Sequence, residues 1–345
     1  MKKNFWKTLT ATLALTTMAL TGCGSQPVAT STASAAGTDT AAPITLRVGV
    51  STNRTPHLVS IVAEKEGIYA KHNLVVVPAE FSSGIETVNA IELGQVDLGY
   101  VADFGGFNRL GNLADPSKSD LRFFARLEKT ATMSLYANPD NVSSAAELRG
   151  KTIGISKGTV IEYFNKVMLD QNGIGLDEVT ILPVEGGAGL ALAERGDVDA
   201  IWAGVANKSK YAEYGFEEIL TQNDLGVFQN SLYVTTQTQI DKDTEGLVRY
   251  LQATQETYDF IGANFDTAVA DIVAATGMEQ AMAEDALHGT TLTLDYAADL
   301  VRDLKDLDQW MKDNGYYENS LDLKYFTNTE VLRKALPDAE IAEVE

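Results

Sequence analysis

Two segments of this chain resemble each other at a constant offset of 102 positions. SSGIETVNAIELGQVDLG begins at Ser82, and VEGGAGLALAERGDVDAI begins at Val184. The recurring positions pair Gly84 with Gly186, Glu92 with Glu194, Gly94 with Gly196, Val96 with Val198 and Asp97 with Asp199. A helix-to-strand turn that ends in glycine explains the Gly-x-Val-Asp part locally. A match at constant offset over the whole segment predicts two structural copies of one unit.

Each copy lies within an alternation of short β-branched apolar runs and amphipathic stretches. The predicted strands are 45–50, 74–77 and 96–101 in the first unit, and 151–156, 179–184 and 198–203 in the second. A helix is predicted over 160–169. This order predicts an α/β architecture of two doubly wound lobes, each with a parallel sheet covered on both faces. Their cleft lies at the carboxyl ends of the strands, where open α/β sheets bind ligands.

The rest of the chain is assigned around these two units. Strands at 132–137 and 230–236 are expected to carry the chain into the second lobe and back, as a two-strand hinge. Helices with apolar faces over 247–261 and 300–311 are predicted to pack on the first lobe. The predicted domains are a signal peptide at 1–22, a disordered tether at 23–43, lobe 1 at 44–134 plus 233–345, and lobe 2 at 135–232.

The start of the chain predicts export. Three lysines precede an apolar run over 9–20, which is too short to span a bilayer as a permanent helix. Thr21 and Gly22 then stand before Cys23, the only cysteine of the chain. This pattern resembles the lipobox of bacterial lipoproteins, and the resemblance implies cleavage before Cys23 and acylation of Cys23 by diacylglycerol and palmitate. An ordinary secretory signal with an incidental cysteine is the alternative.

Composition limits the partners. Residues 24–43 are almost entirely Ala, Ser, Thr, Gly, Pro and Gln, which is typical of a flexible tether. A formal charge of −21 makes nucleic acid a poor partner. A single cysteine allows no internal disulfide, and the three histidines lack the spacing of metal ligands. We therefore expect a monomer with no metal and no cofactor, held on the cell membrane and facing the periplasm or the outside of the cell.

Several segments carry a family resemblance. They are LRGKTIGISKGTVIEYFNKVMLDQNGI from Leu148, ALAERGDVDAIWAG from Ala191, and TEGLVRYLQATQETYDFIGANFDTAVADIVAATGM from Thr244. Together they resemble the solute-binding proteins of ABC importers, in the branch for aliphatic sulfonates, taurine, nitrate and the thiamine pyrimidine precursor. The resemblance implies a periplasmic-binding-protein type II fold, closure of two lobes on one ligand, and delivery to a membrane permease with its ATPase. It leaves the solute open.

Three loops of the first lobe supply candidate ligand-binding residues: Thr52, Arg54 and His57; Ser82, Ser83 and Gly84; Asp103 and Phe104. Arg54 is suited to pair with an anionic group, or is only an exposed arginine. His57 donates to the ligand or caps the next helix. The two serines and the glycine precede a helix and form an anion site with its N–H groups, or only an N-cap. Asp103 suits an ammonium group, and Phe104 suits stacking on an apolar ligand.

The second lobe contributes a loop and a tryptophan. Lys157, Gly158 and Thr159 precede a helix and are expected to complete the anion site from the opposite side. Glu162 stands one turn into that helix, where the helix dipole alone stabilises it; in the cleft it would instead favour a cationic group. Trp202 follows the last strand of this lobe and either closes over a planar ligand or belongs to the core.

These residues favour an importer receptor for a small organosulfonate. Taurine carries both a sulfonate and an ammonium group, so it suits the two serines together with Glu162 or Asp103. A thiamine-type pyrimidine precursor or another planar heterocycle is the alternative ligand. An exported accessory receptor that has lost transport is an alternative from another class. Enzymes are disfavoured, because the chain offers neither a reactive cysteine beyond Cys23 nor grouped histidines.

Overall fold

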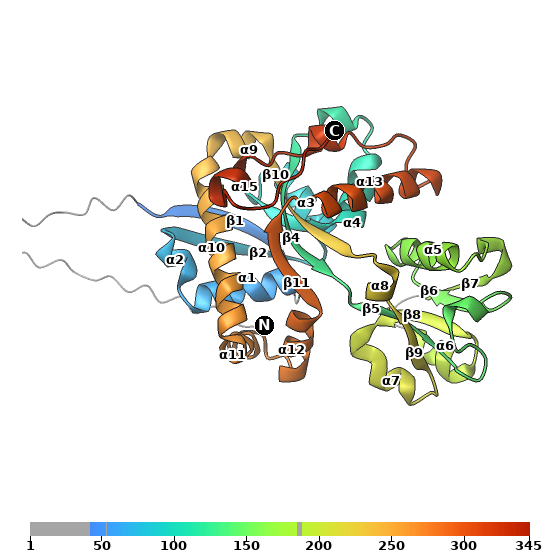
Figure 1. Ribbon diagram of the computed structural model, residues 1–345. Coiled ribbons are helices and arrows are strands. Elements are labelled where there is room, and N and C mark those ends of the chain that lie inside the picture. The colour runs from blue at the N-terminus through green and yellow to red at the C-terminus, as the bar shows by residue number, and fades with distance from the viewer. Residues whose placement is uncertain (1–41, 53, 185–187) are drawn as a thin grey trace, which may run out of the picture. The chain divides into compact units, whose positions relative to one another are not determined.

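The computed structural model describes residues 42–345 except 53 and 185–187 (Figure 1). The predicted signal peptide, the lipidation site at Cys23 and most of the predicted tether lie outside the described residues. The same is true of Gly186 in the second copy of the repeat.

Lobe 1 is the part of the chain built on two neighbouring sheets. β1 (Ile44–Ser51) and β2 (Leu74–Phe81) form a parallel pair. The second sheet has the order β11–β4–β10–β3 and consists of β3 (Gly99–Ala102), β4 (Leu121–Thr130), β10 (Gln229–Thr236) and β11 (Thr290–Asp295). A parallel bridge between Val48 and Leu98 joins β1 to the residue before β3. The strands therefore follow one another as β2, β1, β3, β10, β4, β11.

Lobe 2 is the part built on the five-stranded sheet β7–β6–β8–β5–β9. Its strands are β5 (Met133–Ala137), β6 (Thr152–Ile155), β7 (Thr180–Pro183), β8 (Ala200–Gly204) and β9 (Glu217–Thr221). β6 pairs in parallel with β7 and β8, whereas β5 pairs antiparallel with β8 and β9.

The predicted α/β class is confirmed, but the prediction of purely parallel sheets is wrong. In both lobes the repeated unit gives three strands in the order second, first, third: β2, β1, β3 and β7, β6, β8. Each sheet also takes in the strand by which the chain arrives from the other lobe, β10 in lobe 1 and β5 in lobe 2. That strand runs antiparallel to its neighbours. The four-stranded sheet of lobe 1 is therefore antiparallel throughout and lies beside the parallel pair β1 and β2, whereas the five-stranded sheet of lobe 2 is mixed.

The chain crosses between the lobes twice. It passes from β4 to β5 through residues 131–132, and from α8 (Gln222–Leu225) to β10 through residues 226–228. The strands β5 and β10 flank these crossings and form the two-strand connection between the lobes. The limits of the lobes, 44–134 plus 233–345 and 135–232, stay predictions.

Both copies of the repeat end in the same local structure. Gly94 and Gly196 have φ of +66° and +71°, a left-handed conformation that favours glycine after a helix. Oδ2 of Asp97 accepts a hydrogen bond from the backbone N of Arg47 in β1, at 2.8 Å. Oδ2 of Asp199 accepts the equivalent bond from the backbone N of Thr152 in β6, at 2.9 Å. The turn before each third strand is thus fastened to the first strand of its own lobe.

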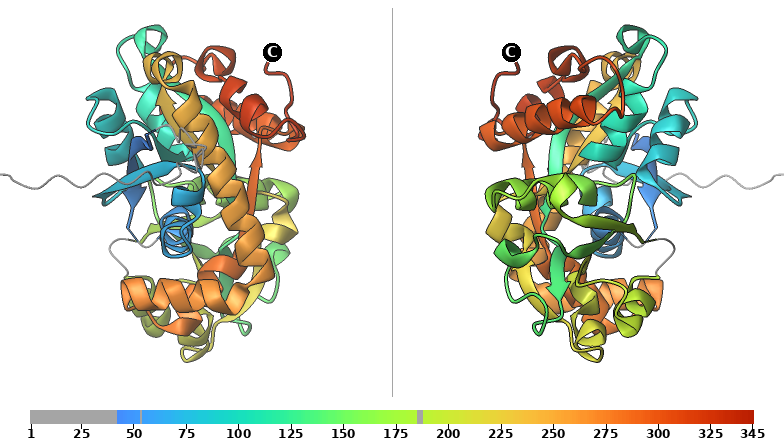
Figure 2. Two further views of the ribbon diagram at one scale, coloured as in Figure 1. Left: turned by 90° about the vertical axis from the view of Figure 1, so that its left-hand side faces the viewer. Right: turned by 90° about the vertical axis from the view of Figure 1, so that its right-hand side faces the viewer.

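The helices cover the sheets. In chain order they are α1 (Thr55–Lys65), α2 (Ile68–Lys71), α3 (Gly84–Glu92), α4 (Asp103–Gly111), α5 (Ile161–Gln171), α6 (Gly189–Arg195), α7 (Lys208–Ala212), α8, α9 (Gln237–Lys242), α10 (Thr244–Ala263), α11 (Phe265–Thr276), α12 (Gln280–His288), α13 (Ala298–Asp313), α14 (Leu323–Phe326) and α15 (Glu330–Ala335). The long helix α10 packs against α1 and α15 (Figure 2). The apolar faces predicted for α10 and α13 are buried in the core of lobe 1.

The core of lobe 2 is divided by its sheet. Leu135 and Ala137 of β5 and Trp202 of β8 belong to one buried cluster. Tyr136 and Ile201, which alternate with them along the same strands, belong to another. Because successive strand residues point to opposite faces, both faces of this sheet are covered, as predicted.

Candidate functional site

A polar pocket of about 390 Å³ lies in lobe 1 and is called the lobe-1 pocket. It is formed by the ends of β1, β3 and β4, the start of β10, and the starts of α1 and α3. Its lining includes four of the residues predicted from the sequence: Arg54, Ser82, Ser83 and Gly84. These residues follow the carboxyl ends of parallel strands, where open α/β sheets usually bind their ligands. The volume of the pocket suits a small solute.

The start of α3 is capped by its own side chains. The Ser83 hydroxyl accepts a hydrogen bond from the backbone N of Glu86, at 3.3 Å. In return, the Glu86 carboxylate accepts from both the backbone N and the hydroxyl of Ser82, at 2.9 Å each. Ser83 is therefore the N-cap of α3, and an anion bound at Ser82 must compete with Glu86. An anion site at these serines stays a prediction.

Gly84 serves the packing of α3 on β3. A side chain there would place its Cβ 3.1 Å from the Cα of Val101 and 3.3 Å from the carbonyl oxygen of Tyr100. The close approach that this glycine permits is therefore to the backbone of β3. Any larger residue would push the start of α3 away from the pocket wall.

Arg54 is the arginine of the lobe-1 pocket. Its side chain is exposed, and its guanidinium has no hydrogen-bond or ion-pair partner among the described residues. Its backbone N donates to the carbonyl oxygen of Ser51 at 3.2 Å, which fixes the turn between β1 and α1. An unpaired guanidinium beside the start of a helix is a suitable donor for an anionic group.

Sequence reasoning missed Glu128, which lines the same pocket from β4. Its side chain is 5% exposed, and Oε1 accepts a hydrogen bond from the hydroxyl of Ser231 at 2.8 Å. Oε2 is buried without a hydrogen-bond partner among the described residues. Burial raises the pKa of Glu128 to about 7, although the Ser231 hydrogen bond and the charge of Arg54 oppose this shift.

A β-bulge in β4 determines where Glu128 lies. β10 pairs Ser231 with Glu128 and Leu232 with Arg126, so Leu127 is left without an opposite residue. The register of β11 on β4 shifts in the same region. The carbonyl oxygen of Leu127 accepts instead from the hydroxyl of Tyr258, at 2.7 Å. Bulges redirect side chains, and here one separates the pocket carboxyl from the neighbouring arginine.

That arginine, Arg126, is the centre of a buried ionic cluster. It is 2% exposed and donates to both carboxylate oxygens of Asp295, at 2.9 Å each, and to both of Asp299, at 3.1 and 3.0 Å. Burial opposes ionisation of Asp299, but the hydrogen bonds and the charge of Arg126 outweigh burial and lower its pKa to about 2. The cluster joins β4, β11 and α13.

Asp103 belongs to the polar interior and lines a different pocket. Its carboxylate accepts from the backbone N of Asn230 at 2.8 Å and from that of Phe104 at 2.7 Å. Burial raises the pKa of Asp103 to about 6, against these hydrogen bonds. The pocket that it lines, of about 230 Å³, includes Tyr163 and Asp303. The Phe104 ring is buried and packs edge-on against Tyr316, with ring centroids 5.2 Å apart.

Thr52 and His57 also lie away from the lobe-1 pocket. The Thr52 hydroxyl lies 3.4 Å from a carboxylate oxygen of Glu80 on the exposed side of β2. His57 lines a separate groove of about 320 Å³ together with Tyr69. Burial lowers the pKa of His57 there. Contact of these two residues with a ligand stays a prediction.

Lys157 and Glu162 are brought together in a third pocket, of about 270 Å³, with Trp310 and Tyr316. The backbone N of Gly158 donates to Oε2 of Glu162 at 3.0 Å, and the Tyr316 hydroxyl donates to the same oxygen. Glu162 therefore binds its own loop and the segment that follows α13.

Thr159 is likewise engaged within its loop. Its hydroxyl donates to the carbonyl oxygen of Ser156 at 2.7 Å and accepts from the backbone N of Ile161 at 3.3 Å. The structure thus groups the four predicted residues of this loop apart from the lobe-1 pocket. An anion site formed by them stays a prediction.

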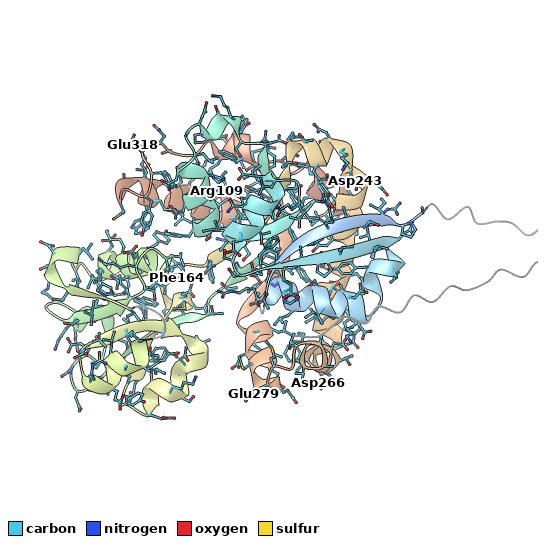
Figure 3. All side chains as sticks on the ribbon, turned by 180° about the vertical axis from the view of Figure 1, so that it is seen from behind. Arg109, Phe164, Asp243, Asp266, Glu279 and Glu318 are labelled. Carbon is cyan, nitrogen blue, oxygen red and sulfur yellow. The ribbon has the colours of Figure 1, made fainter. Side chains whose placement is uncertain are left out.

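Trp202 lies in the core of lobe 2, as its alternative interpretation stated. It is 3% exposed, and its Nε1 donates to Oδ1 of Asn165 at 3.3 Å. Its ring lies 6.3 Å from that of Phe164, which Figure 3 labels within lobe 2. The indole N–H therefore has its hydrogen-bond partner inside lobe 2.

The described part of the chain holds neither a cluster of metal-ligating side chains nor a helix suited to cross a membrane. Within residues 42–345, apart from 53 and 185–187, no cluster of three or more His, Cys, Asp and Glu side chains is arranged to hold a metal ion. Over the same residues, none of the helices combines the length and the apolar character that crossing a membrane requires.

Three solved structures share this architecture. The periplasmic aliphatic sulphonate binding protein SsuA of Escherichia coli aligns with a TM-score of 0.69 and 17% identity, over 82% of this chain and 97% of its own. The alkanesulfonate-binding protein SsuA of Xanthomonas axonopodis pv. citri, bound to MOPS, gives 0.63 and 14%, over 84% and 99%. The desulfurization enzyme DSZB gives 0.60 and 15%, over 85% and 99%.

The two lobes, their open sheets and these similarities define the fold of the type II periplasmic binding proteins. A family model extends this from fold to family. The model described as NMT1/THI5 like matches residues 54–268, which is more than half of the chain. The chain therefore belongs to the NMT1/THI5-like family.

Proposed function

We propose that this protein is the extracytoplasmic receptor of an ABC importer and that it binds a small organosulfonate, with taurine as the first candidate. The observation that carries the proposal is the unpaired guanidinium of Arg54 beside the serine-rich start of α3, in a pocket at the ends of β1 and β3. These groups suit a sulfonate, which accepts several hydrogen bonds at once. Similarity in fold to two sulfonate-binding proteins supports the choice.

Binding without catalysis fits the lobe-1 pocket better than an enzymatic role. The fold itself does not decide, because a desulfurization enzyme shares it. The lining of the pocket, however, contains neither a cysteine nor a histidine. The lining therefore offers neither a thiol nucleophile nor an imidazole base to activate one of its hydroxyl groups. Closure of two lobes around a solute needs only contacts that exist in the closed form.

The proposal includes a lipid anchor on Cys23. An acylated Cys23 would hold the receptor at the membrane through more than one chain, which gives stable attachment. The tether then keeps the lobes near the permease and its ATPase. This part rests on the sequence pattern alone.

An aminopyrimidine is the second candidate ligand. Glu128 favours it, because a buried carboxyl can accept hydrogen bonds from an exocyclic amine. The two aromatic residues predicted to stack on such a ring are Phe104 and Trp202, and both are buried in the core. Taurine therefore stays the first choice.

Calorimetric titration and thermal unfolding of residues 24–345 test the proposal. Taurine, ethanesulfonate, nitrate and an aminopyrimidine are compared. A ligand at a hundred times its dissociation constant adds about 2.7 kcal/mol to the free energy of unfolding, which thermal unfolding detects readily. Arg54→Ala should weaken sulfonate binding, whereas Arg195→Ala, which removes an exposed arginine of lobe 2, should leave it unchanged. Binding of the aminopyrimidine alone would refute the sulfonate assignment.

A further inference from the structure

We infer that Glu128 recognises a positively charged amino group on the solute, so that this receptor selects aminosulfonates over sulfonates that lack an amine. The inference rests on the proposed function, because it assigns the second end of the same ligand. Glu128 lines the lobe-1 pocket from β4, and Arg54 lines it from the turn after β1. The pocket thus carries one group of each charge, as a zwitterion requires.

The described residues supply a hydrogen-bond donor to only one of the two carboxylate oxygens of Glu128. Ser231 donates to Oε1, but Oε2 has no donor among the described residues. A carboxylate that is 95% buried normally has partners for both oxygens, because each unpartnered buried acceptor destabilises the folded state. The hydroxyl of Ser51, which lines the same pocket, is also buried and has no hydrogen-bond partner within the part of the chain that the structure describes.

The hydroxyl and ammonium groups near Glu128 bind other partners. The Tyr100 hydroxyl, at the same pocket, already donates to the carbonyl oxygen of Ser51 at 3.0 Å and accepts from its backbone N at 2.8 Å. The Tyr258 hydroxyl donates to Leu127. Lys129, the next residue in β4, lies over the ring of Phe228 and reaches Asp299. No arginine or lysine of the described residues forms an ion pair with Glu128.

The bulge in β4 separates Glu128 from Arg126. A regular strand would place Arg126 and Glu128 on the same face, where the two charges could pair. The bulge at Leu127 intervenes, and Arg126 is fully used by Asp295 and Asp299. A carboxylate kept apart from the nearest arginine of its own strand remains available for a cation from outside the protein.

The alternative is a purely structural Glu128, held by Ser231 and protonated in the folded protein. The two roles differ in what they predict for ligands. A structural carboxyl is indifferent to an amine on the solute. A recognition carboxylate makes taurine bind about ten- to a hundredfold more tightly than ethanesulfonate, since a hydrogen bond to a charged group is worth roughly 1.5–3 kcal/mol.

The experiment measures dissociation constants of residues 24–345 at pH 8 for two matched pairs of probes. One pair is taurine and ethanesulfonate; the other is an aminopyrimidine and the same ring without its amine. The variant is Glu128→Gln, which keeps an acceptor for Ser231 and has nearly the same shape. Glu86→Gln is the matched control, because it changes the carboxylate that accepts hydrogen bonds from Ser82 of the pocket and should change the binding of both sulfonates alike.

Preference for taurine in the wild type, lost in Glu128→Gln and kept in Glu86→Gln, is the expected result. Equal affinity for the two sulfonates in the wild type, or a preference that survives Glu128→Gln, would overturn the inference and leave the sulfonate receptor standing. If only the aminopyrimidine binds, the sulfonate proposal and the recognition of a charged amino group both fail, because the exocyclic amine of that ring is uncharged at pH 8. If none of the four probes binds, both fail.

Discussion

Glu128 should make the ligand-free protein less stable at alkaline pH, and Glu128→Gln should remove this effect. Burial raises the pKa of Glu128 from its ordinary value of 4.5 to about 7. Between these two pH values the folded state binds more protons than the unfolded state, so the free energy of unfolding falls as pH rises from about 4.5 to about 7. At 1.36 kcal/mol for each pKa unit, ionised Glu128 costs the fold about 3 kcal/mol at pH 8.

At pH 5 the same carboxyl is mostly protonated in the folded protein, and its cost is below about 1 kcal/mol. Glutamine carries no charge at either pH. We therefore expect Glu128→Gln to raise the free energy of unfolding relative to wild type by about 2 kcal/mol more at pH 8 than at pH 5. Denaturant unfolding at both pH values, without ligand, measures this difference.

Three charged or titratable groups, Arg54, Tyr100 and Tyr258, interact with the charge of Glu128. Burial raises the pKa of both tyrosines above the ordinary value, so neither of them ionises between pH 5 and pH 8. Glu86→Gln, which removes an exposed carboxylate, should show no comparable difference between the two pH values. A Glu128→Gln protein that is less stable than wild type at pH 8, or changed equally at both pH values, would refute the reasoning.

Four further predictions concern the ionic cluster of Arg126, the core of lobe 2 and the lipid anchor. Arg126→Ala should lower the free energy of unfolding by about 3–5 kcal/mol in denaturant titration at pH 7, because the carboxylates of Asp295 and Asp299 lose the guanidinium with which they form ion pairs. The stability that Asp299 contributes should disappear as pH falls from about 4 to about 2, since its pKa is depressed; an unchanged acid limb in Arg126→Ala would contradict this. Trp202→Ala should cost about 3–5 kcal/mol of thermal stability and leave the dissociation constant of taurine unchanged. Cys23→Ser should move the protein from the membrane fraction to the soluble fraction, and retention in the membrane fraction would refute the anchor.

The sequence predicted the features that depend on local pattern. The repeat was visible because Gly94, Asp97 and their counterparts Gly196 and Asp199 perform the same local task in each lobe. Arg54 and the serines before α3 were found because residues after parallel strands collect at one edge of the sheet.

The features that depend on distant partners could not be predicted in this way. Glu128 lies in the pocket because β4 pairs with β10 through a bulge, and the two strands are about a hundred residues apart. Glu162 is bound by Tyr316, which lies 154 positions further along the chain. The available signal was a carboxylate two residues after an arginine in the strand-forming segment Leu121–Thr130, since buried charges in a strand need an explanation.

The strand order also bears on how the chain folds as it is synthesised from its N-terminus. Lobe 2 is one uninterrupted stretch, so its sheet can be completed as soon as β9 has appeared. Lobe 1 cannot be completed then, because β10, which lies between β3 and β4, follows all of lobe 2 in the chain. Until β10 arrives, β3 and β4 present open strand edges that can pair with other chains. The later lobe to fold is thus the one that begins first, and its unfinished edges are where a chaperone would be needed until the rest of the chain has appeared.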